Sequence, residues 1–137
     1  MNGGMELYLH MPFCVRKCAY CDFLSFPTDQ ETQNLYTRRL REDIDVMGKK
    51  YGDIPVDTIF IGGGTPSVPD SALIVGIMEH VRKAFHVAEG AEISMEANPG
   101  TVTREKLTDY RRAGINRLSF GLQSANDREL KLLGRIH

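Results

Sequence analysis

The chain alternates segments of strand character with segments of helical periodicity, and this alternation limits its possible folds more than any other feature. We expect strands at about residues 6–10, 56–61, 91–97 and 117–121, with a helix following each of them. This order is typical of a parallel sheet whose strands are joined by crossover helices. The sequence therefore predicts an α/β fold of about four β/α units.

The expected strands carry apolar and polar residues in alternation, which places the two kinds on opposite faces of the sheet. In the strand at 91–97 the apolar set is Ile93, Met95 and Ala97. The polar set is Glu92, Ser94, Glu96 and Asn98. A doubly wound sheet is covered by helices on both faces and would be apolar on both. One polar face instead predicts a TIM-type (β/α) barrel, or part of one, with a polar lumen.

The expected helices have identifiable ends and apolar stripes. The first spans about residues 28–47, with a capping box of Thr28 and Glu31. Its buried stripe is expected to be Tyr36, Leu40, Ile44 and Met47. The expected stripe of the second helix is Leu73, Ile77, Val81 and Phe85. The third spans about residues 103–113 and stops at Gly114, and the last starts with a capping box of Asn126 and Glu129.

Unusual residues follow each of the expected strands. They are the loop with the three cysteines, the run 62–64 of three glycines, Glu96 with Asn98-Pro99, and Gln123-Ser124. The sites of barrel enzymes lie at the carboxyl ends of the strands, so these residues are expected around one site. Four β/α units are too few to close a barrel. We therefore expect residues 1–137 to be the N-terminal part of a core domain, with the remaining strands and a C-terminal domain absent.

The three cysteines have the spacing Cys-x3-Cys-x2-Cys at Cys14, Cys18 and Cys21. An odd number of clustered cysteines with no distant partner fits metal ligation in a reducing compartment better than a disulfide. Three thiolates can hold three corners of a [4Fe-4S] cluster and leave its fourth iron open to another ligand. A zinc site with His10 as the fourth ligand is the alternative.

Composition excludes several classes of partner. The formal net charge of −1 does not indicate binding to nucleic acid or to an anionic membrane. No apolar run approaches the roughly 18 residues that span a bilayer, and the first residues lack the apolar stretch of a signal peptide. We therefore expect a cytoplasmic protein with a small-molecule partner and no stable insertion into a membrane.

Four blocks of sequence carry a resemblance to a known family. They are YLHMPFC at residues 8–14 with Cys18, Tyr20 and Cys21, IGGGTP at 61–66, EANPG at 96–100 and NRLSFGLQS at 116–124. In order and spacing they resemble the radical S-adenosylmethionine (SAM) superfamily. More narrowly, the chain is similar to the oxygen-independent coproporphyrinogen III oxidase family and to its haem-chaperone (HemW-like) branch.

The resemblance implies a [4Fe-4S] cluster and SAM as cofactors, with Cys14, Cys18 and Cys21 as cluster ligands. It implies one-electron cleavage of SAM to a 5'-deoxyadenosyl radical, with the cofactors supplying the chemistry and the protein positioning them. The cofactor-binding residues that it implies are Tyr8, Tyr20, Gly63, Gly64, Thr65, Glu96, Gln123 and Arg135. No side chain is assigned as catalytic.

One position bears on the branch of the family. Members of the oxidase branch carry an additional cysteine two residues after the third ligand, and this chain has Phe23 there. The resemblance therefore favours a haem chaperone that hands haem to an accepting protein. An oxidase that decarboxylates a porphyrinogen is the first alternative, and a cluster-binding scaffold without turnover is the second. An electron donor is implied in either of the radical readings.

Overall fold

The main sheet has four parallel strands in the order β1-β4-β5-β6. They are β1 (Met5–Met11), β4 (Val56–Gly63), β5 (Val87–Ala97) and β6 (Arg117–Phe120). The structure, a computed structural model, describes residues 4–14, 26–27 and 29–120. Neighbouring strands are also consecutive units of the chain, so the sheet winds in one direction as a barrel does. The predicted α/β fold with a parallel sheet is confirmed.

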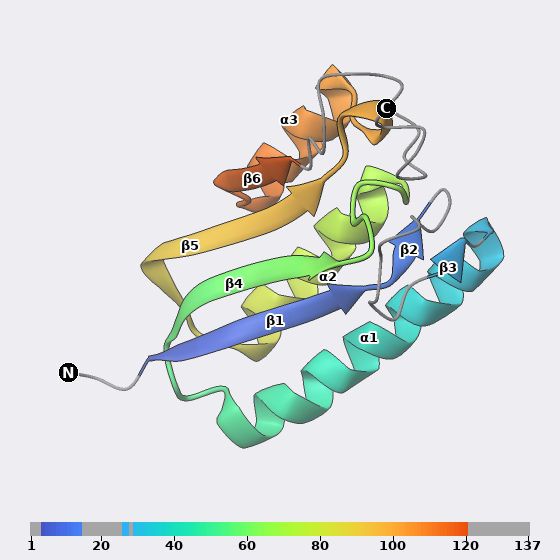
Figure 1. Ribbon diagram of the computed structural model, residues 1–137. Helices are drawn as coiled ribbons and strands as arrows, with labels where there is room; N and C mark the ends of the chain where they lie inside the picture. Colours follow the sequence, from blue (N-terminus) through green and yellow to red (C-terminus); the bar gives the residue numbers. More distant parts are fainter. Residues whose placement is uncertain (1–3, 15–25, 28, 121–137) are drawn as a thin grey trace.

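Three helices connect these strands. They are α1 (Gln30–Tyr51), α2 (Ser71–Ala84) and α3 (Arg104–Ala113). The helix α2 packs between α1 and α3, so the three form one layer against the sheet (Figure 1). A short 3-10 turn, η1 (Pro99–Thr101), follows β5. A second, two-stranded parallel sheet of β2 (Phe13–Cys14) and β3 (Phe26–Pro27) lies beyond the end of β1.

The core lies between the sheet and the helices. Leu9, Ile61 and Met95 are in register across β1, β4 and β5, and all three are buried. From the helix layer, Ile74, Ile77, Met78 and Val81 of α2 and Tyr110 of α3 join this core. Burial of such side chains contributes about 1.5–3 kcal/mol each, so this layer is the main source of stability.

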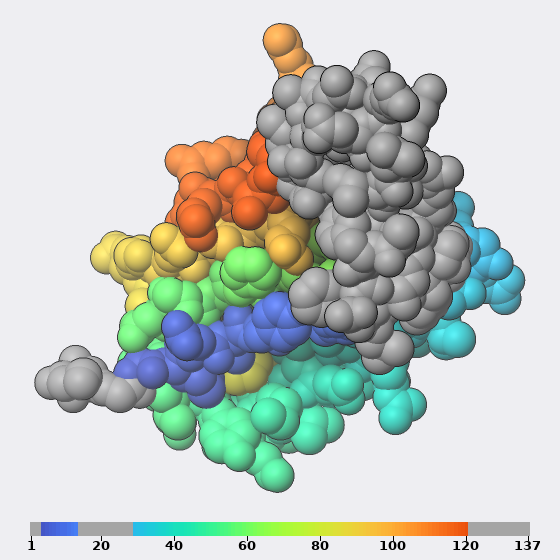
Figure 2. Space-filling view, in the orientation of Figure 1, coloured from blue at the N-terminus to red at the C-terminus, as the bar shows by residue number. Residues whose placement is uncertain are grey.

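The other face of the sheet is polar, and none of the helices among the described residues lies on it (Figure 1). Figure 2 views this face, and β1, β4, β5 and β6 lie on it side by side in the order of the sheet. Tyr8 is 57% exposed here, whereas Leu9, the next residue in β1, is 6% exposed. The prediction of one apolar and one polar face is therefore confirmed.

The predicted first helix is wrong at both ends. Its N-cap is Asp29, whose side chain accepts a hydrogen bond from the Thr32 N–H, and Thr28 is not the cap. The helix continues through Gly48 to Tyr51, and the N–H of its C-cap Gly52 donates to the Gly48 carbonyl. Met47, placed in the buried stripe, is 46% exposed, since the stripe runs through Thr37 and Ile44.

Smaller differences concern the other elements. In α2 the buried stripe includes Ile74 and Met78, which the prediction left out, while Leu73 is half-buried. The strand β5 begins at Val87 rather than Ala91, because the parallel ladder pairs Val56 of β4 with Val87. The helix α3 begins after Thr103 and ends at Gly114 in the left-handed conformation, as predicted. The last predicted helix lies outside the described residues.

Candidate functional site

The predicted cofactor residues that the structure describes gather at the carboxyl ends of β1, β4 and β5. These ends lie at one edge of the sheet because the strands are parallel (Figure 1). Gly63 ends β4 and Glu96 is the second-last residue of β5. The Gly63 N–H donates a hydrogen bond of 3.0 Å to Glu96 Oε1, although 33 residues separate the two in sequence.

The glycines of this loop lie where a side chain would collide with other parts of the site. Gly63 has φ +114°, and a Cβ there would lie 2.6 Å from the His10 ring. At Gly64 a Cβ would lie 2.6 Å from the carbonyl oxygen of Phe13. Only residues without a Cβ let the backbone approach neighbours or a ligand this closely. Both positions therefore require glycine for packing, and Gly63 requires it for its backbone conformation as well.

Aromatic side chains of β1 and β4 lie next to one another on the polar face, on the side of the strands that precedes this loop. Tyr8 stacks on Phe60 with ring centroids 6.0 Å apart. The Tyr8 hydroxyl is 3.1 Å from His10 Nδ1, within hydrogen-bonding distance. Burial, and then the negative charge of Glu96, raise the pKa of Tyr8, so its phenol stays protonated at neutral pH.

The backbone before the first cysteine is bound to the glycine loop. The Thr65 N–H donates to the Phe13 carbonyl over 2.5 Å, and the Gly64 N–H donates to the Met11 carbonyl over 2.8 Å. Tyr36 of α1 donates from its hydroxyl to the His10 carbonyl over 2.5 Å. The loop that carries the cysteines therefore starts, at Cys14 in β2, from backbone held against Gly64 and Thr65.

A cluster of buried polar groups ties the segment after β4 to the segment after β5. Ser67 is 0% exposed, and its Oγ accepts the Asn98 N–H over 3.1 Å and lies 2.5 Å from Thr101 Oγ1. The Lys106 ammonium donates to the carbonyls of Ser67 and Thr101 over 2.6 Å and 3.0 Å. Burial lowers the pKa of Lys106, and the negative charge of Asp70 opposes that shift. Neither Ser67 nor Lys106 was among the site residues predicted from the sequence.

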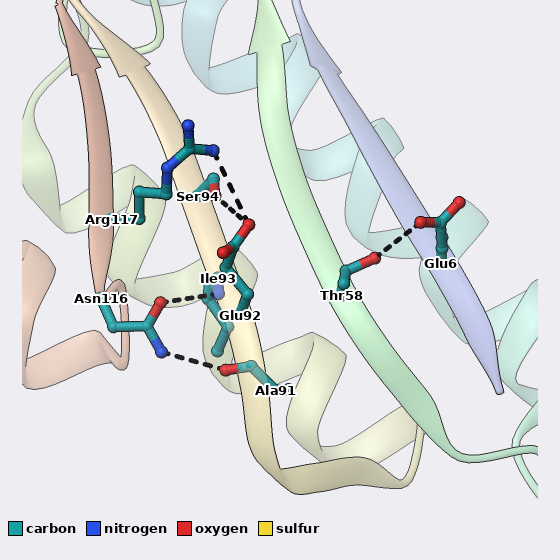
Figure 3. Close-up of polar contacts among 8 residues, drawn as sticks. All are labelled: Glu6, Thr58, Ala91, Glu92, Ile93, Ser94, Asn116 and Arg117. Atoms are coloured by element: carbon teal, nitrogen blue, oxygen red, sulfur yellow. Dashed lines mark hydrogen bonds and ion pairs between the residues drawn. The ribbon is translucent and has the colours of Figure 1, made fainter.

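Further along the polar face, charged and hydroxyl side chains pair across the strands (Figure 3). Glu6 accepts from Thr58 over 3.3 Å, and Glu92 lies 3.7 Å from Arg117. A hollow of 410 Å³ opens on this face, lined by Glu6, Tyr8, Thr58, Phe60, Glu92 and Ser94. It leads from the amino-terminal part of the strands towards Tyr8, so the polar face includes a recess next to the candidate site.

The structure describes only part of the predicted site. It places Gly63, Gly64, Thr65 and Glu96 at the carboxyl ends of β4 and β5, with the backbone before Cys14 beside the glycine loop. Tyr8 lies in the middle of β1, and its hydroxyl reaches His10 towards that end. Cys18, Tyr20, Cys21, Gln123 and Arg135 lie outside the described residues. Within residues 4–14, 26–27 and 29–120, no group of three or more His, Cys, Asp or Glu side chains is arranged to hold a metal ion. The zinc alternative and the cluster both stay predictions.

No helix among these same residues has the length and apolar character needed to cross a membrane.

The described part of the site fits a bound amino-acid-like cofactor. Two glycines in sequence let the backbone of the loop pass close to His10 and Phe13 at the carboxyl end of β1. The carboxylate of Glu96 stands beside this loop and is oriented by the Gly63 N–H. A carboxylate offers about four acceptor positions, so Glu96 can accept from Gly63 and from ammonium or hydroxyl donors of a ligand together.

Comparisons with known proteins agree with this arrangement. The family model described as the Radical SAM superfamily matches residues 8–137. The "Heme chaperone HemW" of Escherichia coli is 46% identical over 134 residues, which are 97% of this chain and 35% of that protein. The protein of the same name from Haemophilus influenzae is 40% identical over 138 residues, covering 97% of this chain and 36% of its own length.

A solved structure resembles the whole described fold. It is the coproporphyrinogen III oxidase HemN of Escherichia coli, a radical SAM enzyme, with a TM-score of 0.93 and 31% identity. The match covers 99% of this chain and 32% of that one. The chain thus spans about a third of the length of the proteins it matches. The matched family implies a [4Fe-4S] cluster and SAM as cofactors. Because the family model matches nearly the whole chain, the chain belongs to the radical SAM superfamily.

Proposed function

We propose that this chain is the N-terminal part of the core domain of a haem-handling radical SAM protein. Cys14, Cys18 and Cys21 hold the [4Fe-4S] cluster, and SAM lies at the carboxyl ends of β1, β4 and β5. The hydrogen bond from Gly63 to Glu96 carries this proposal, because it joins two predicted cofactor contacts from separate β/α units. The 46% identity to a heme chaperone over nearly the whole chain supports the haem-handling part.

The residues of the chain bind and orient the cofactors. Gly63, Gly64 and Thr65 meet the methionyl amino group, and Glu96 accepts hydrogen bonds from that group or from ribose hydroxyls. Tyr8, Tyr20, Gln123 and Arg135 complete the SAM site, with the forked donors of Arg135 suited to the methionyl carboxylate. When bound, the cluster and SAM supply one-electron radical chemistry.

The role that we propose for the whole protein is that of a haem chaperone, with an electron donor and a haem-accepting protein as partners. The relatives at 46% and 40% identity carry that name. Phe23, where the oxidase branch has a cysteine, supports the same choice. The coproporphyrinogen oxidase reading is the second candidate, because the solved structure with a TM-score of 0.93 has that activity.

The test uses the longest protein that the gene encodes, reconstituted with iron and sulfide without oxygen. We expect the visible charge-transfer absorption of an iron–sulfur cluster, loss of that absorption in Cys18→Ala, and 5'-deoxyadenosine after reduction with SAM present. Uptake of zinc without iron and sulfide would contradict the cluster. A protein that holds the cluster but forms no 5'-deoxyadenosine would instead be a cluster-binding scaffold without turnover.

Glu96 gives the test a matched pair of variants. Glu96→Gln keeps an acceptor for Gly63 but removes the charge, so we expect SAM affinity to fall about tenfold, the usual worth of one charge-assisted hydrogen bond. Glu92→Gln makes the same change four residues earlier on the same face of β5, where Glu92 pairs with Arg117. Isothermal titration with SAM should show no change for Glu92→Gln. An equal loss of SAM affinity in both variants would mean that Glu96 does not contact SAM.

The branch of the family is tested with two tetrapyrroles. We expect stable binding of haem and no conversion of coproporphyrinogen III by the reduced protein with SAM. Formation of protoporphyrinogen would overturn the chaperone role and support the oxidase. Chromatography of the porphyrins after oxidation distinguishes the two results.

A further inference from the structure

We propose that Lys106 is a positioning residue for the SAM site, which it serves by tying the segment after β4 to the segment after β5. This inference rests on the proposed function, since it assigns the SAM contacts to those two segments. Lys106 itself lies in the first turn of α3. The side-chain hydrogen bonds that it makes within the described part of the chain go to Ser67 and Thr101. It acts through the backbone of Ser67 and Thr101.

The position of Lys106 in its helix is an unfavourable one for a lysine. Thr103 is the N-cap of α3, and its hydroxyl accepts the Lys106 N–H over 3.1 Å, which makes Lys106 the third residue of the helix. A capping box has Glu or Gln there, and the positive end of the helix dipole disfavours a cation. A lysine at this position therefore needs a compensating contact elsewhere in the fold.

Two backbone carbonyls supply that contact. The ammonium donates to the Ser67 carbonyl over 2.6 Å and to the Thr101 carbonyl over 3.0 Å. These carbonyls come from different β/α units, since Ser67 and Thr101 are 34 residues apart in sequence. Hydrogen bonds from a charged donor are about twice as strong as neutral ones. Lys106 thus joins the segment after β4 to the segment after β5, which are distant from each other in sequence.

Ser67 extends this tie to both walls of the proposed SAM site. It lies inside the turn closed by the Val68 N–H and the Thr65 carbonyl over 3.0 Å, so its position is linked to Thr65. Its Oγ accepts the N–H of Asn98, two residues after Glu96. Thr101 closes the cluster by donating from its hydroxyl to the Asn98 carbonyl over 2.8 Å.

These polar groups around Ser67 therefore join the same two parts of the fold that the hydrogen bond between Gly63 and Glu96 joins at the site itself. If Lys106 is removed, two partly buried carbonyls lose their charged donor, and among the described residues the turn at Thr65 is held to the segment after β5 only by the hydroxyl contacts of Ser67. Sub-ångström errors in positioning groups of this kind weaken cofactor binding substantially. The loss is expected in the affinity for SAM rather than in the chemical step.

The experiment compares three variants in the longest protein that the gene encodes, with the cluster reconstituted. Lys106→Met removes the ammonium, and Lys106→Arg keeps a charged donor. Lys83→Met makes the same charge change on an exposed position of α2. We expect Lys106→Met to raise the KM and Kd for SAM about tenfold, within the usual range for coupled sites. The kcat for 5'-deoxyadenosine formation should change less than about twofold.

Lys106→Arg should regain at least half of the lost affinity, and Lys83→Met should match the wild type. A purely structural role would instead lower kcat per total protein through loss of folded molecules, with KM unchanged, and would overturn the proposal. Where Lys106→Met does not fold, Lys106→Gln, which keeps a neutral donor, is measured in its place against the same expectation.

Failure of this inference differs from failure of the proposed function. A wild-type protein that binds and cleaves SAM, with Lys106→Met unchanged in KM and Kd, overturns only the role of Lys106. A wild-type protein that neither binds nor cleaves SAM overturns both.

Discussion

At the scale of single residues, Gly64 shows how closely the loop after β4 approaches the end of β1. A Cβ at Gly64 would lie 2.6 Å and 2.7 Å from the backbone oxygen and nitrogen of Phe13, and backbone cannot move aside as a flexible side chain can. We expect Gly64→Ala to lower the free energy of unfolding by about 1–3 kcal/mol, the cost of overpacking. Urea unfolding followed by circular dichroism measures this change.

Gly90 provides the control for this substitution. It is exposed in β5, and a Cβ there would meet no atom within 4 Å. Gly90→Ala should therefore change the free energy of unfolding by less than about 0.5 kcal/mol. A Gly64→Ala protein as stable as Gly90→Ala would mean that the loop does not lie against Phe13.

At the scale of elements, Asn116 fixes the register of β6 against β5 (Figure 3). Its amide oxygen accepts the Ile93 N–H over 2.9 Å, and its amide nitrogen donates to the Ala91 carbonyl over 3.0 Å. Both partners belong to buried residues. Asn116→Ala leaves these groups unpaired, so we expect a loss of about 2–3 kcal/mol in the free energy of unfolding. Faster hydrogen exchange at the Ile93 amide would accompany it.

Asn116→Asp separates the two hydrogen bonds. The carboxylate can still accept from Ile93 but cannot donate to Ala91. Protection of the Ile93 amide should therefore survive in Asn116→Asp while the protein is destabilised. If that amide exchanges as fast as in Asn116→Ala, then the acceptor half of the contact does not hold β6 in place.

At the scale of the whole molecule, Tyr110 makes stability depend on pH in the alkaline range. It is 1% exposed in the core, and burial, followed by the negative charges of Asp109 and Asp70, raises its pKa from 10.0 to about 12. Between these values the unfolded chain has released the phenol proton and the folded protein has kept it. Stability therefore falls as the pH rises from 10 to 12, by about 1.4 kcal/mol per pH unit.

Tyr110→Phe should remove this part of the decline, as measured by urea unfolding at pH 8, 10 and 11. Among the described residues the Tyr110 hydroxyl has no hydrogen-bond partner, so at pH 8 the variant should be at least as stable as the wild type. Tyr51→Phe, at a position 41% exposed, is the matched control and should keep the wild-type decline. Parallel pH profiles for wild type and Tyr110→Phe would contradict the assignment.

The sequence by itself determined the parallel α/β fold, because the order of strands and helices and the alternation along each strand are local properties of the chain. It also determined which residues belong to the edge with the site, since parallel strands bring their carboxyl ends together. On that basis Gly63 and Glu96 were expected around one site, and the structure adds the hydrogen bond between them. The N-cap of α1 was misplaced because Thr28 and Asp29 are both good caps, and only the backbone conformation decides between them.

The tertiary structure decided the contacts that join one β/α unit to another. That Gly64 abuts Phe13, that Ser67 receives Asn98, and that Lys106 reaches two carbonyls depend on loop paths that no periodicity encodes. A lysine at the third position of α3 was a local signal that something unusual holds it there. Its partners could not be predicted, since they follow from the packing of α3 beside the loop after β4.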